Sequence, residues 1–188
     1  MLKSLLLRES EFNFKPSELF LIFSLAKAQA AAKGDFAEVG VYRGLSAEVL
    51  CRAKGDKTLW LFDTFEGLPD VGSSDPLFTK GTYKSSLPAV RKRLEPWQGV
   101  QLIQGFFPQS SDPVRERRFT FVHLDVDLYE STRASLEFFY PRMEQGGFLL
   151  SHDYGQALGV KRAFDEFFAD KSEKIIELPM SQCMVIKD

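Results

Sequence analysis

The sequence predicts an α/β protein with a doubly wound, mostly parallel sheet of seven strands that has an antiparallel strand at its C-terminal edge. Three observations favour this fold. Short apolar runs alternate with helical segments along nearly the whole chain, which is typical of parallel sheets. The run 58–64 is apolar on both faces, as a central parallel strand is. Two short runs, 174–179 and 182–188, end the sequence as an expected hairpin.

The first half of the sequence is divided by glycines and prolines. Pro16 suits the first position of a helix, and Gly34 and Gly55 each follow an expected helix. The elements expected here are a helix at 16–33, a strand at 35–41, a helix at 45–54 and a strand at 58–64. The segment from 66 to about 84 is rich in Gly, Ser, Pro and Asp, and we expect it to be a mobile lid.

The second half continues the same alternation. Its expected elements are a helix at 86–97, strands at 99–107 and 118–127, a helix at 131–143, a strand at 148–153 and a helix at 159–170. Ligands of such sheets bind at the carboxyl ends of the strands, so polar residues at these ends are the candidates for a functional site.

Bulk composition limits the classes of function. A chain of 188 residues is the size of one domain, and we expect residues 1–188 to form one. The net charge of -2 argues against a nucleic-acid partner, and no apolar stretch is long enough to span a membrane. We therefore expect a cytoplasmic protein that acts on a small molecule. The sequence leaves a homo-oligomer open.

A glycine turn follows the strand at 35–41. Its pattern, Glu38-x-Gly40-x-x-x-Gly44, leads into a helix whose first turn contains Ser46. Glycines let a ligand approach the backbone, and a helix N-terminus offers N–H groups to a carboxylate. The pattern is not the G-x-G-x-x-G of dinucleotide-binding folds. A tight turn with no ligand is the competing interpretation.

Two further strand ends favour adenosine binding. Asp63 lies 23 residues after Gly40, about the separation at which an acidic residue accepts hydrogen bonds from ribose hydroxyls. An Asp at this position can equally cap a turn. Gly105 and Phe106, after the third strand, are placed to border an adenine ring.

Four polar residues end the fourth and fifth strands. Asp125 and Asp127 close one strand, and His152 and Asp153 close the next. Consecutive strands of this kind are often neighbours, so we expect these side chains to converge. Carboxylates and imidazole together suit a divalent metal. Separate caps and surface ion pairs are the alternative. His123, inside an apolar strand, is expected to be a buried, hydrogen-bonded side chain.

Several motifs resemble the macrocin O-methyltransferase family. These are FAEVGVYRG, LFDTFEGLP, GFFP and HLDVDLYESTRASLEFFYPRMEQGGFLLSHDYG, over roughly residues 35–155. Members are class I methyltransferases with a Rossmann-like fold, and they methylate sugar hydroxyls of natural products with S-adenosylmethionine. The resemblance implies a cofactor site made by Glu38, Gly40, Gly44, Ser46, Asp63, Gly105 and Phe106.

The resemblance also implies how the carboxylate cluster works. Asp125 and Asp153 match carboxylates that hold magnesium, and Asp127 matches the residue that takes the hydroxyl proton. Members typically carry two Asp residues where this sequence has His152 and Asp153. Three roles stay open for His152: a ligand to magnesium or a transition metal, a general base, or a structural residue. Two alternative functions are a protein that binds S-adenosylmethionine without methyl transfer and an NAD(P)-dependent oxidoreductase.

Overall fold

The computed structural model describes residues 14–188 and confirms the predicted fold class. One sheet of seven strands has the order β3-β2-β1-β4-β5-β7-β6. The first five strands run parallel, and β7 pairs antiparallel with both β5 and β6. The strands are β1 (Asp35–Val39), β2 (Leu59–Asp63), β3 (Val100–Gln104), β4 (Phe119–Leu124), β5 (Met143–Ser151), β6 (Ile176–Glu177) and β7 (Cys183–Ile186).

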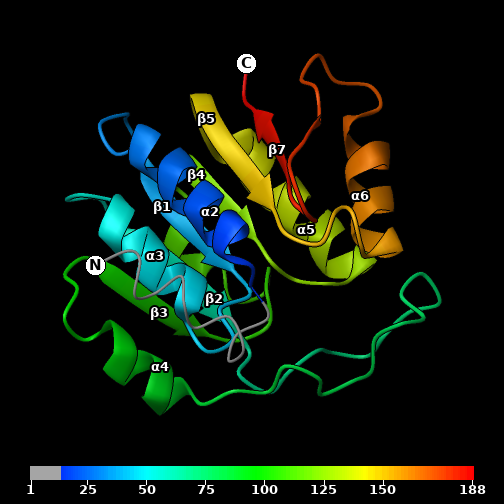
Figure 1. The fold of residues 1–188 in the computed structure, drawn as a ribbon, viewed down its shortest axis with the longest axis horizontal. Helices are drawn as coiled ribbons and strands as arrows, with labels where there is room; N and C mark the ends of the chain where they lie inside the picture. The colour runs from blue at the N-terminus through cyan, green and yellow to red at the C-terminus, as the bar shows by residue number, and fades with distance from the viewer. Residues whose placement is uncertain (1–13) are drawn as a thin grey trace.

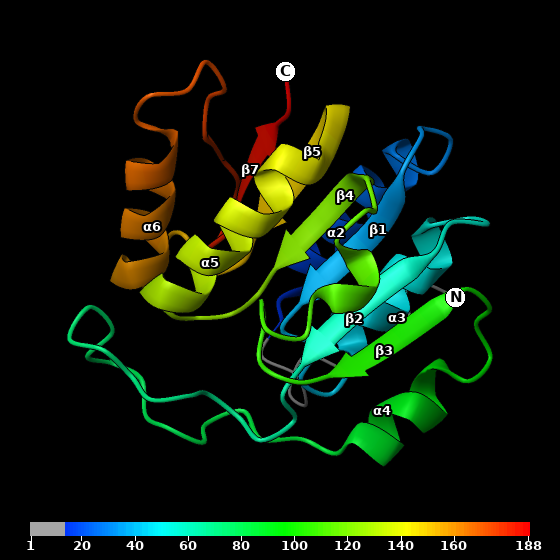
Figure 2. The ribbon, with the colours of Figure 1, turned by 180° about the vertical axis from the view of Figure 1, so that it is seen from behind.

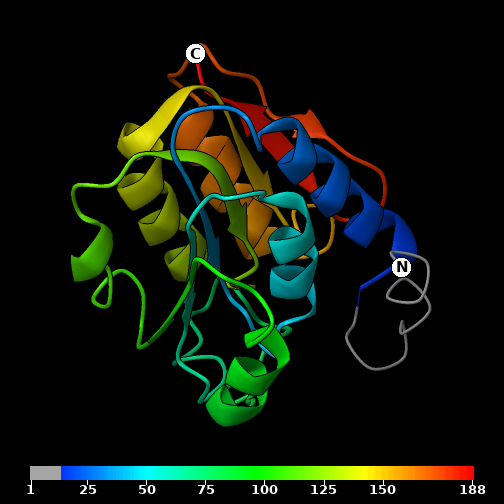
Figure 3. The ribbon, with the colours of Figure 1, turned by 90° about the vertical axis from the view of Figure 1, so that its left-hand side faces the viewer.

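Helices cover both faces of the sheet (Figures 1 and 2). One face carries α2 and α3 and the other carries α5 and α6, and the side view separates the layers (Figure 3). The helices are α2 (Pro16–Ala28), α3 (Leu45–Ala53), α4 (Leu87–Leu94), α5 (Tyr129–Phe139) and α6 (Leu158–Phe168), with short 3-10 turns η2 (Asp112–Val114) and η3 (Tyr140–Arg142). No helix in residues 14–188 is long and apolar enough to cross a membrane.

The central strands feed two separate hydrophobic cores. In β2, Leu59 and Leu61 pack with α2 and α3, whereas Trp60 and Phe62 join the core beneath α5 and α6. Alternate side chains of an extended strand point to opposite faces, so a strand covered on both sides must be apolar throughout. The run 58–64 is therefore apolar on both faces because β2 is covered by helices on both sides.

The main departure from the predicted elements is at β5. We expected a helix through Met143 and a strand only from Phe148, but α5 ends at Phe139 and β5 begins at Met143. Pro141 ends the α-helix because it has no N–H to donate, and the chain passes through η3 instead. Gly146, with φ of 75°, lets the strand bend and still continue. The parallel strands also end earlier than predicted, which puts the polar residues just past their ends.

The segment 66–84 runs along the carboxyl end of the sheet toward α5 and α6 (Figure 1). Near its base the two arms are joined, because Leu68 N–H donates to Thr82 O at 2.8 Å and Gly81 N–H donates to Leu68 O at 2.9 Å. At its far end the carboxylate of Asp75 accepts from the backbone N–H of Tyr129, at 3.1 and 3.2 Å. The segment 66–84 is therefore attached at its base and also at its tip, near Asp75.

Candidate active site

A cavity of about 450 Å³ opens at the carboxyl ends of the parallel strands. Nine of the site residues predicted from the sequence line it: Gly40, Ser46, Asp63, Gly105, Phe106, Asp125, Asp127, His152 and Asp153. Glu38 and Gly44 do not. The strand-end reasoning thus brought most candidates to one place.

Strand register explains why the candidates meet. Leu124 of β4 is paired with Ser151 of β5, so Asp125 and His152 are the next residues on neighbouring strands. The backbone N–H of His152 still donates to Leu124 O at 2.8 Å, which continues the ladder one step past the strand. Consecutive parallel strands therefore deliver their terminal side chains to the same edge.

Gly40 lets the turn after β1 approach β4. Its φ is 88°, in the left-handed region that glycine adopts without strain. A Cβ at this position would lie 1.7 Å from the backbone oxygen of Asp125. No side chain fits at that distance. Because Gly40 has no side chain, the turn after β1 can lie against the end of β4, and the glycine turn and the carboxylate cluster share one cavity.

Asp63 joins the turns that follow β1 and β2. Its Oδ2 accepts the N–H groups of Val41 and Tyr42 at 2.7 and 2.8 Å, and its Oδ1 accepts the N–H of Phe65 at 2.6 Å. The turn-capping interpretation is therefore correct for Asp63. Each carboxylate oxygen has two lone pairs, and the side chain also lines the cavity. Its contact with ribose hydroxyls remains a prediction.

Glu38 lies beneath the cavity rather than in its wall. It is fully buried, and its Oε1 is 2.8 Å from Nδ1 of His123, its register partner on β4. Burial raises the pKa of Glu38, while hydrogen bonds from His123 and Ser46 oppose the rise. The predicted buried, hydrogen-bonded His123 is confirmed. Glu38 supports the turn from below in this structure, and Gly44, with φ of 80°, starts α3.

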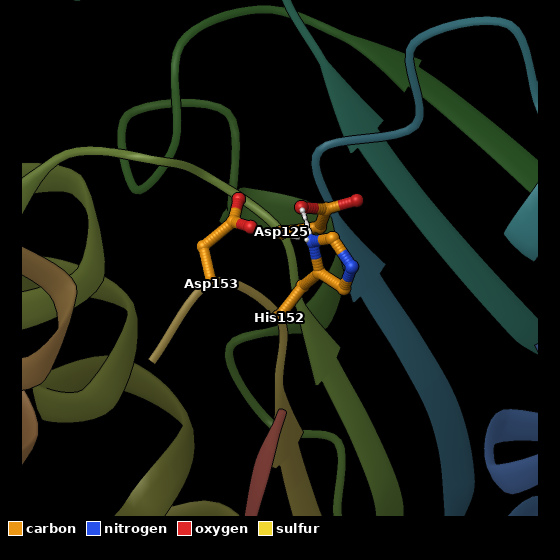
Figure 4. Close-up of side chains that lie close together, drawn as sticks. All are labelled: Asp125, His152 and Asp153. Carbon is orange, nitrogen blue, oxygen red and sulfur yellow. Dashed lines mark ion pairs between the residues drawn. The ribbon is translucent and has the colours of Figure 1, made fainter. Parts of the chain in front are cut away.

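Asp125, His152 and Asp153 form a compact group (Figure 4). Nδ1 of His152 lies 3.2 Å from Oδ1 of Asp125 and 3.0 Å from Oδ1 of Asp153. One ligand atom from each residue lies within 4.8 Å of the others. The imidazole is thus directed at both carboxylates through one nitrogen.

The pKa values of His152 and Asp125 are shifted in opposite directions, and both shifts favour the charged forms. Burial opposes charge on His152, but Asp125 and the hydrogen bonds of Asp125, Asp153 and Glu18 raise its pKa well above the usual value. Burial also disfavours a charged Asp125, yet the charge and hydrogen bond of His152 hold the pKa of Asp125 below its usual range. Without a bound cation, a protonated His152 therefore neutralises its carboxylate neighbours.

Asp127 behaves differently from Asp125. Burial, then the negative charges of Asp125 and Asp153, raise the pKa of Asp127 well above its usual value. Its φ of 59° and the φ of 61° at Asp153 lie in the left-handed region, which Asp tolerates better than most residues. Strained backbone of this kind concentrates at functional sites. A carboxylate with a raised pKa is suited to accept a proton near neutral pH.

The far side of His152 faces residues that the sequence did not suggest. Oε1 of Glu18, on α2, and Oγ of Ser181, in the β6–β7 turn, each lie 3.5 Å from Nε2. The ring of Phe14 packs against the imidazole, with centroids 4.7 Å apart. A search for polar residues at the ends of strands cannot identify a residue such as Glu18, which lies on a helix. A signal did exist in Lys15-x-x-Glu18, because Glu18 caps α2 by accepting the Lys15 N–H at 2.7 Å.

The open side of the cavity is lined by residues outside the predicted cofactor, metal and catalytic sets. Tyr42 and Tyr83 meet edge to face at 5.7 Å between centroids, and Gln156 and Met180 line the wall beside Asp153. Phe78 does not line the cavity but packs on the core beneath α5 and α6. Tyr83 is therefore the aromatic residue of the segment 66–84 that lies at the cavity.

The sheet order, the glycine turn after β1 and the cluster of carboxylates at the strand ends are together typical of Rossmann-like methyltransferases. The comparisons with known proteins agree. The O-methyltransferase NovP superposes with a TM-score of 0.81 at 26% identity, covering 92% of this chain and 80% of that chain. The family model of the macrocin O-methyltransferases matches residues 25–185. The chain belongs to that family, as its motifs predicted.

Two curated relatives are also similar to this chain. A tetracenomycin rhamnosyl 4'-O-methyltransferase from Streptomyces olivaceus is 33% identical, over 64% of this chain and 53% of its own length. Demethyldecarbamoylnovobiocin O-methyltransferase from Streptomyces niveus is 30% identical, over 77% of this chain and 63% of its own length. The chain therefore spans between half and two thirds of the curated relatives it matches.

Proposed function

We propose that this protein is an S-adenosylmethionine-dependent O-methyltransferase that acts on a hydroxyl of a small molecule, such as a sugar of a natural product. The observation that carries the proposal is the contact at Gly40, which sets a cofactor-type turn against Asp125 and its neighbours in one cavity. Family membership supports the same activity. Methyl transfer needs these two features side by side.

The cofactor half of the cavity lies over β1, β2 and β3. We place the methionine end on the turn after Gly40 and beside Ser46, with the ribose at Asp63. Gly105 and Phe106, the latter 40% exposed, offer an edge and a ring for the adenine. In this placement the sulfonium points toward the carboxylate cluster.

The reaction is an in-line displacement. The substrate oxygen attacks the methyl carbon, a C–O bond forms as the C–S bond breaks, and the electron pair returns to sulfur. Asp127 takes the hydroxyl proton, for which its raised pKa and its place in the cavity wall suit it. Alignment of the two bound reactants supplies much of the remaining acceleration.

A divalent metal fits beside these residues. Asp125, His152 and Asp153 offer three ligand atoms close enough to share one ion, and a mixed O/N set favours a transition metal over magnesium. When bound, the ion would orient the acceptor's oxygens and lower the pKa of its hydroxyl.

Cofactor binding is tested first by calorimetry with S-adenosylhomocysteine. We expect Asp63→Ala to weaken binding by roughly one hundredfold, because it removes the ribose acceptor and frees two turns. Asp56→Ala, outside the cavity, is the control and should bind as the wild type does. If the wild type binds neither S-adenosylhomocysteine nor S-adenosylmethionine, the proposed function is wrong.

Metal ligation is tested by titrating Mn²⁺ into the wild type and His152→Ala. A ligand nitrogen must be unprotonated, and the pKa of His152 is raised, so we expect Mn²⁺ affinity to increase with pH through the neutral range. His152→Ala should bind more weakly and lose most of this pH dependence. Equal affinity in the two proteins would show that His152 is not a ligand.

We propose that the segment 66–84 is a mobile lid over the acceptor. Few backbone hydrogen bonds hold it between its two attachments, and Tyr83 stands in the cavity wall. We expect its amides to exchange faster than those of β1 and β4 without ligand, and Asp75→Ala to speed them further. Exchange as slow as in the core strands would exclude a lid.

A further inference from the structure

We propose that Glu18 is a positioning residue that fixes the tautomer of His152, so that Nε2 carries hydrogen and Nδ1 is presented to Asp125 and Asp153. The proposal rests on the proposed role of His152 as a ligand. Glu18 lies on α2, before the first residue that the family model matches.

The hydrogen bonds of Ser181 carry the first step. Its hydroxyl has one hydrogen, which it donates to Oε1 of Glu18 at 2.8 Å. Toward Nε2 of His152, 3.5 Å away, the Ser181 oxygen can then offer only lone pairs. Oε1 of Glu18, at 3.5 Å, is also an acceptor. Nε2 faces acceptors alone, so it carries the hydrogen.

The opposite nitrogen carries the second step. Nδ1 lies within 3.2 Å of two carboxylate oxygens, so a bare lone pair there would be repelled. A proton or a metal ion must lie at Nδ1 to relieve this repulsion. Histidine ligands in metal sites commonly donate their other N–H to a carboxylate, which fixes the tautomer and ring orientation. Glu18, His152 and the acidic pair have this arrangement.

Glu18 is itself held firmly in place. Its Oε2 accepts the Lys15 N–H at 2.7 Å, it is 2% exposed, and the ring of Phe14 limits rotation of the imidazole. With the hydrogen bonds from the Lys15 N–H and the Ser181 hydroxyl, Glu18 is therefore a fixed acceptor rather than a solvated surface carboxylate.

Glu18→Gln is a sharp test because it keeps the shape and reverses the polarity. The Lys15 N–H still needs an acceptor, so the amide oxygen takes that position and the NH₂ group turns toward Ser181 and His152. A donor facing Nε2 favours a lone pair there, and hydrogen moves to Nδ1. The variant should therefore place hydrogen on the nitrogen that the acidic pair needs unprotonated for a metal.

Nitrogen NMR reads the tautomer directly, and the chain has only two histidines. With ¹⁵N-labelled histidine and the concentration of Zn²⁺ (a diamagnetic ion) that saturates the wild type, we expect Nε2–H and a metal-bound Nδ1 in the wild type, whereas Glu18→Gln should lose Nε2–H and keep hydrogen on Nδ1. Ser181→Ala should keep Nε2–H, because Glu18 remains. Loss of Nε2–H in Ser181→Ala, or an unchanged tautomer in Glu18→Gln, would overturn the assignment.

Mn²⁺ titration supplies an independent reading. We expect Glu18→Gln to weaken Mn²⁺ binding by about ten- to one-hundredfold, the usual effect of losing a carboxylate behind a ligand histidine. Glu173→Gln is the matched control: Glu173 is also a buried carboxylate, and Lys187 and Tyr140 help lower its pKa to about 2, away from the site. Its Mn²⁺ affinity should equal that of the wild type, and an equal loss in both variants would show a general effect of destabilisation.

Two outcomes separate this proposal from the proposed function. If the wild type binds neither Mn²⁺ nor Zn²⁺, metal ligation is wrong and the ring carries hydrogen on both nitrogens. Glu18 still positions the ring if solvent exchange of Nε2–H is then faster in Glu18→Gln than in the wild type, and equal exchange would show that it does not. If Mn²⁺ binds and the tautomer of Glu18→Gln is unchanged, Glu18 is not a positioning residue. Should Glu18→Gln fail to fold, Glu18→Asp, which retracts the carboxylate by one methylene, should shift the tautomer in the same direction.

Discussion

Asp127→Asn is expected to lower kcat by about one hundred- to ten-thousandfold, the usual contribution of a proton acceptor. Asn has the same shape and also tolerates the φ of 59° at this position, so the backbone should be preserved. What is lost is the oxygen that takes the hydroxyl proton. The rate is measured as S-adenosylhomocysteine release, with a sugar-bearing natural product that the wild type methylates.

Asp112→Asn is the matched control for this change. Asp112 is an exposed carboxylate that pairs with Arg115 at 2.6 Å, and it does not line the cavity. Its rate should stay within a factor of two or so of the wild type, as expected for a surface ion pair. Affinity for S-adenosylhomocysteine should survive in both variants. If Asp127→Asn retains more than a tenth of kcat, another group accepts the proton.

Gly40→Ala is expected to abolish cofactor binding and to destabilise the fold. The new Cβ would lie 1.7 Å from the backbone oxygen of Asp125, so the turn after β1 and the end of β4 must separate. The overlap is with rigid backbone, and the left-handed φ adds about 1 kcal/mol or more of strain. Calorimetry with S-adenosylhomocysteine and thermal unfolding measure the two effects.

Gly146→Ala separates backbone strain from overlap. Gly146 has a similar φ of 75°, but a Cβ there meets no heavy atom within 4 Å. We expect a modest fall in Tm and unchanged affinity for S-adenosylhomocysteine. If Gly40→Ala behaves like Gly146→Ala, the close approach of the two strand ends is not needed for binding.

The strand ends were predictable from the sequence because one rule governs them. In a parallel sheet, apolar runs locate the strands and the first polar residues after them locate the site edge. That reasoning placed Asp63, Asp125, His152 and Asp153 in one cavity. The same reasoning fails for Glu38, which lies inside β1 rather than after its end. The Glu38 side chain contacts His123 of β4 and does not line the cavity.

What could not be predicted depends on how helices and turns pack. Glu18 reaches His152 because α2 lies across the sheet, and Ser181 reaches it because the β6–β7 turn bends back toward β5. Their sequence separation of 163 residues gives no periodic signal. Asp75 is a similar case, since its buried position depends on the ends of α5 and α6 that it contacts.

The attachment at Asp75 has a mechanical consequence for the segment 66–84. A loop with one fixed end swings like a door, whereas one tethered at base and tip bends like a strap between its anchors. At the tip, a Cβ on Gly159 would lie 1.8 Å from Oδ1 of Asp75, so the first turn of α6 grips that carboxylate closely. We therefore expect the segment to open by bowing outward between its base and Asp75 rather than by swinging away from the site.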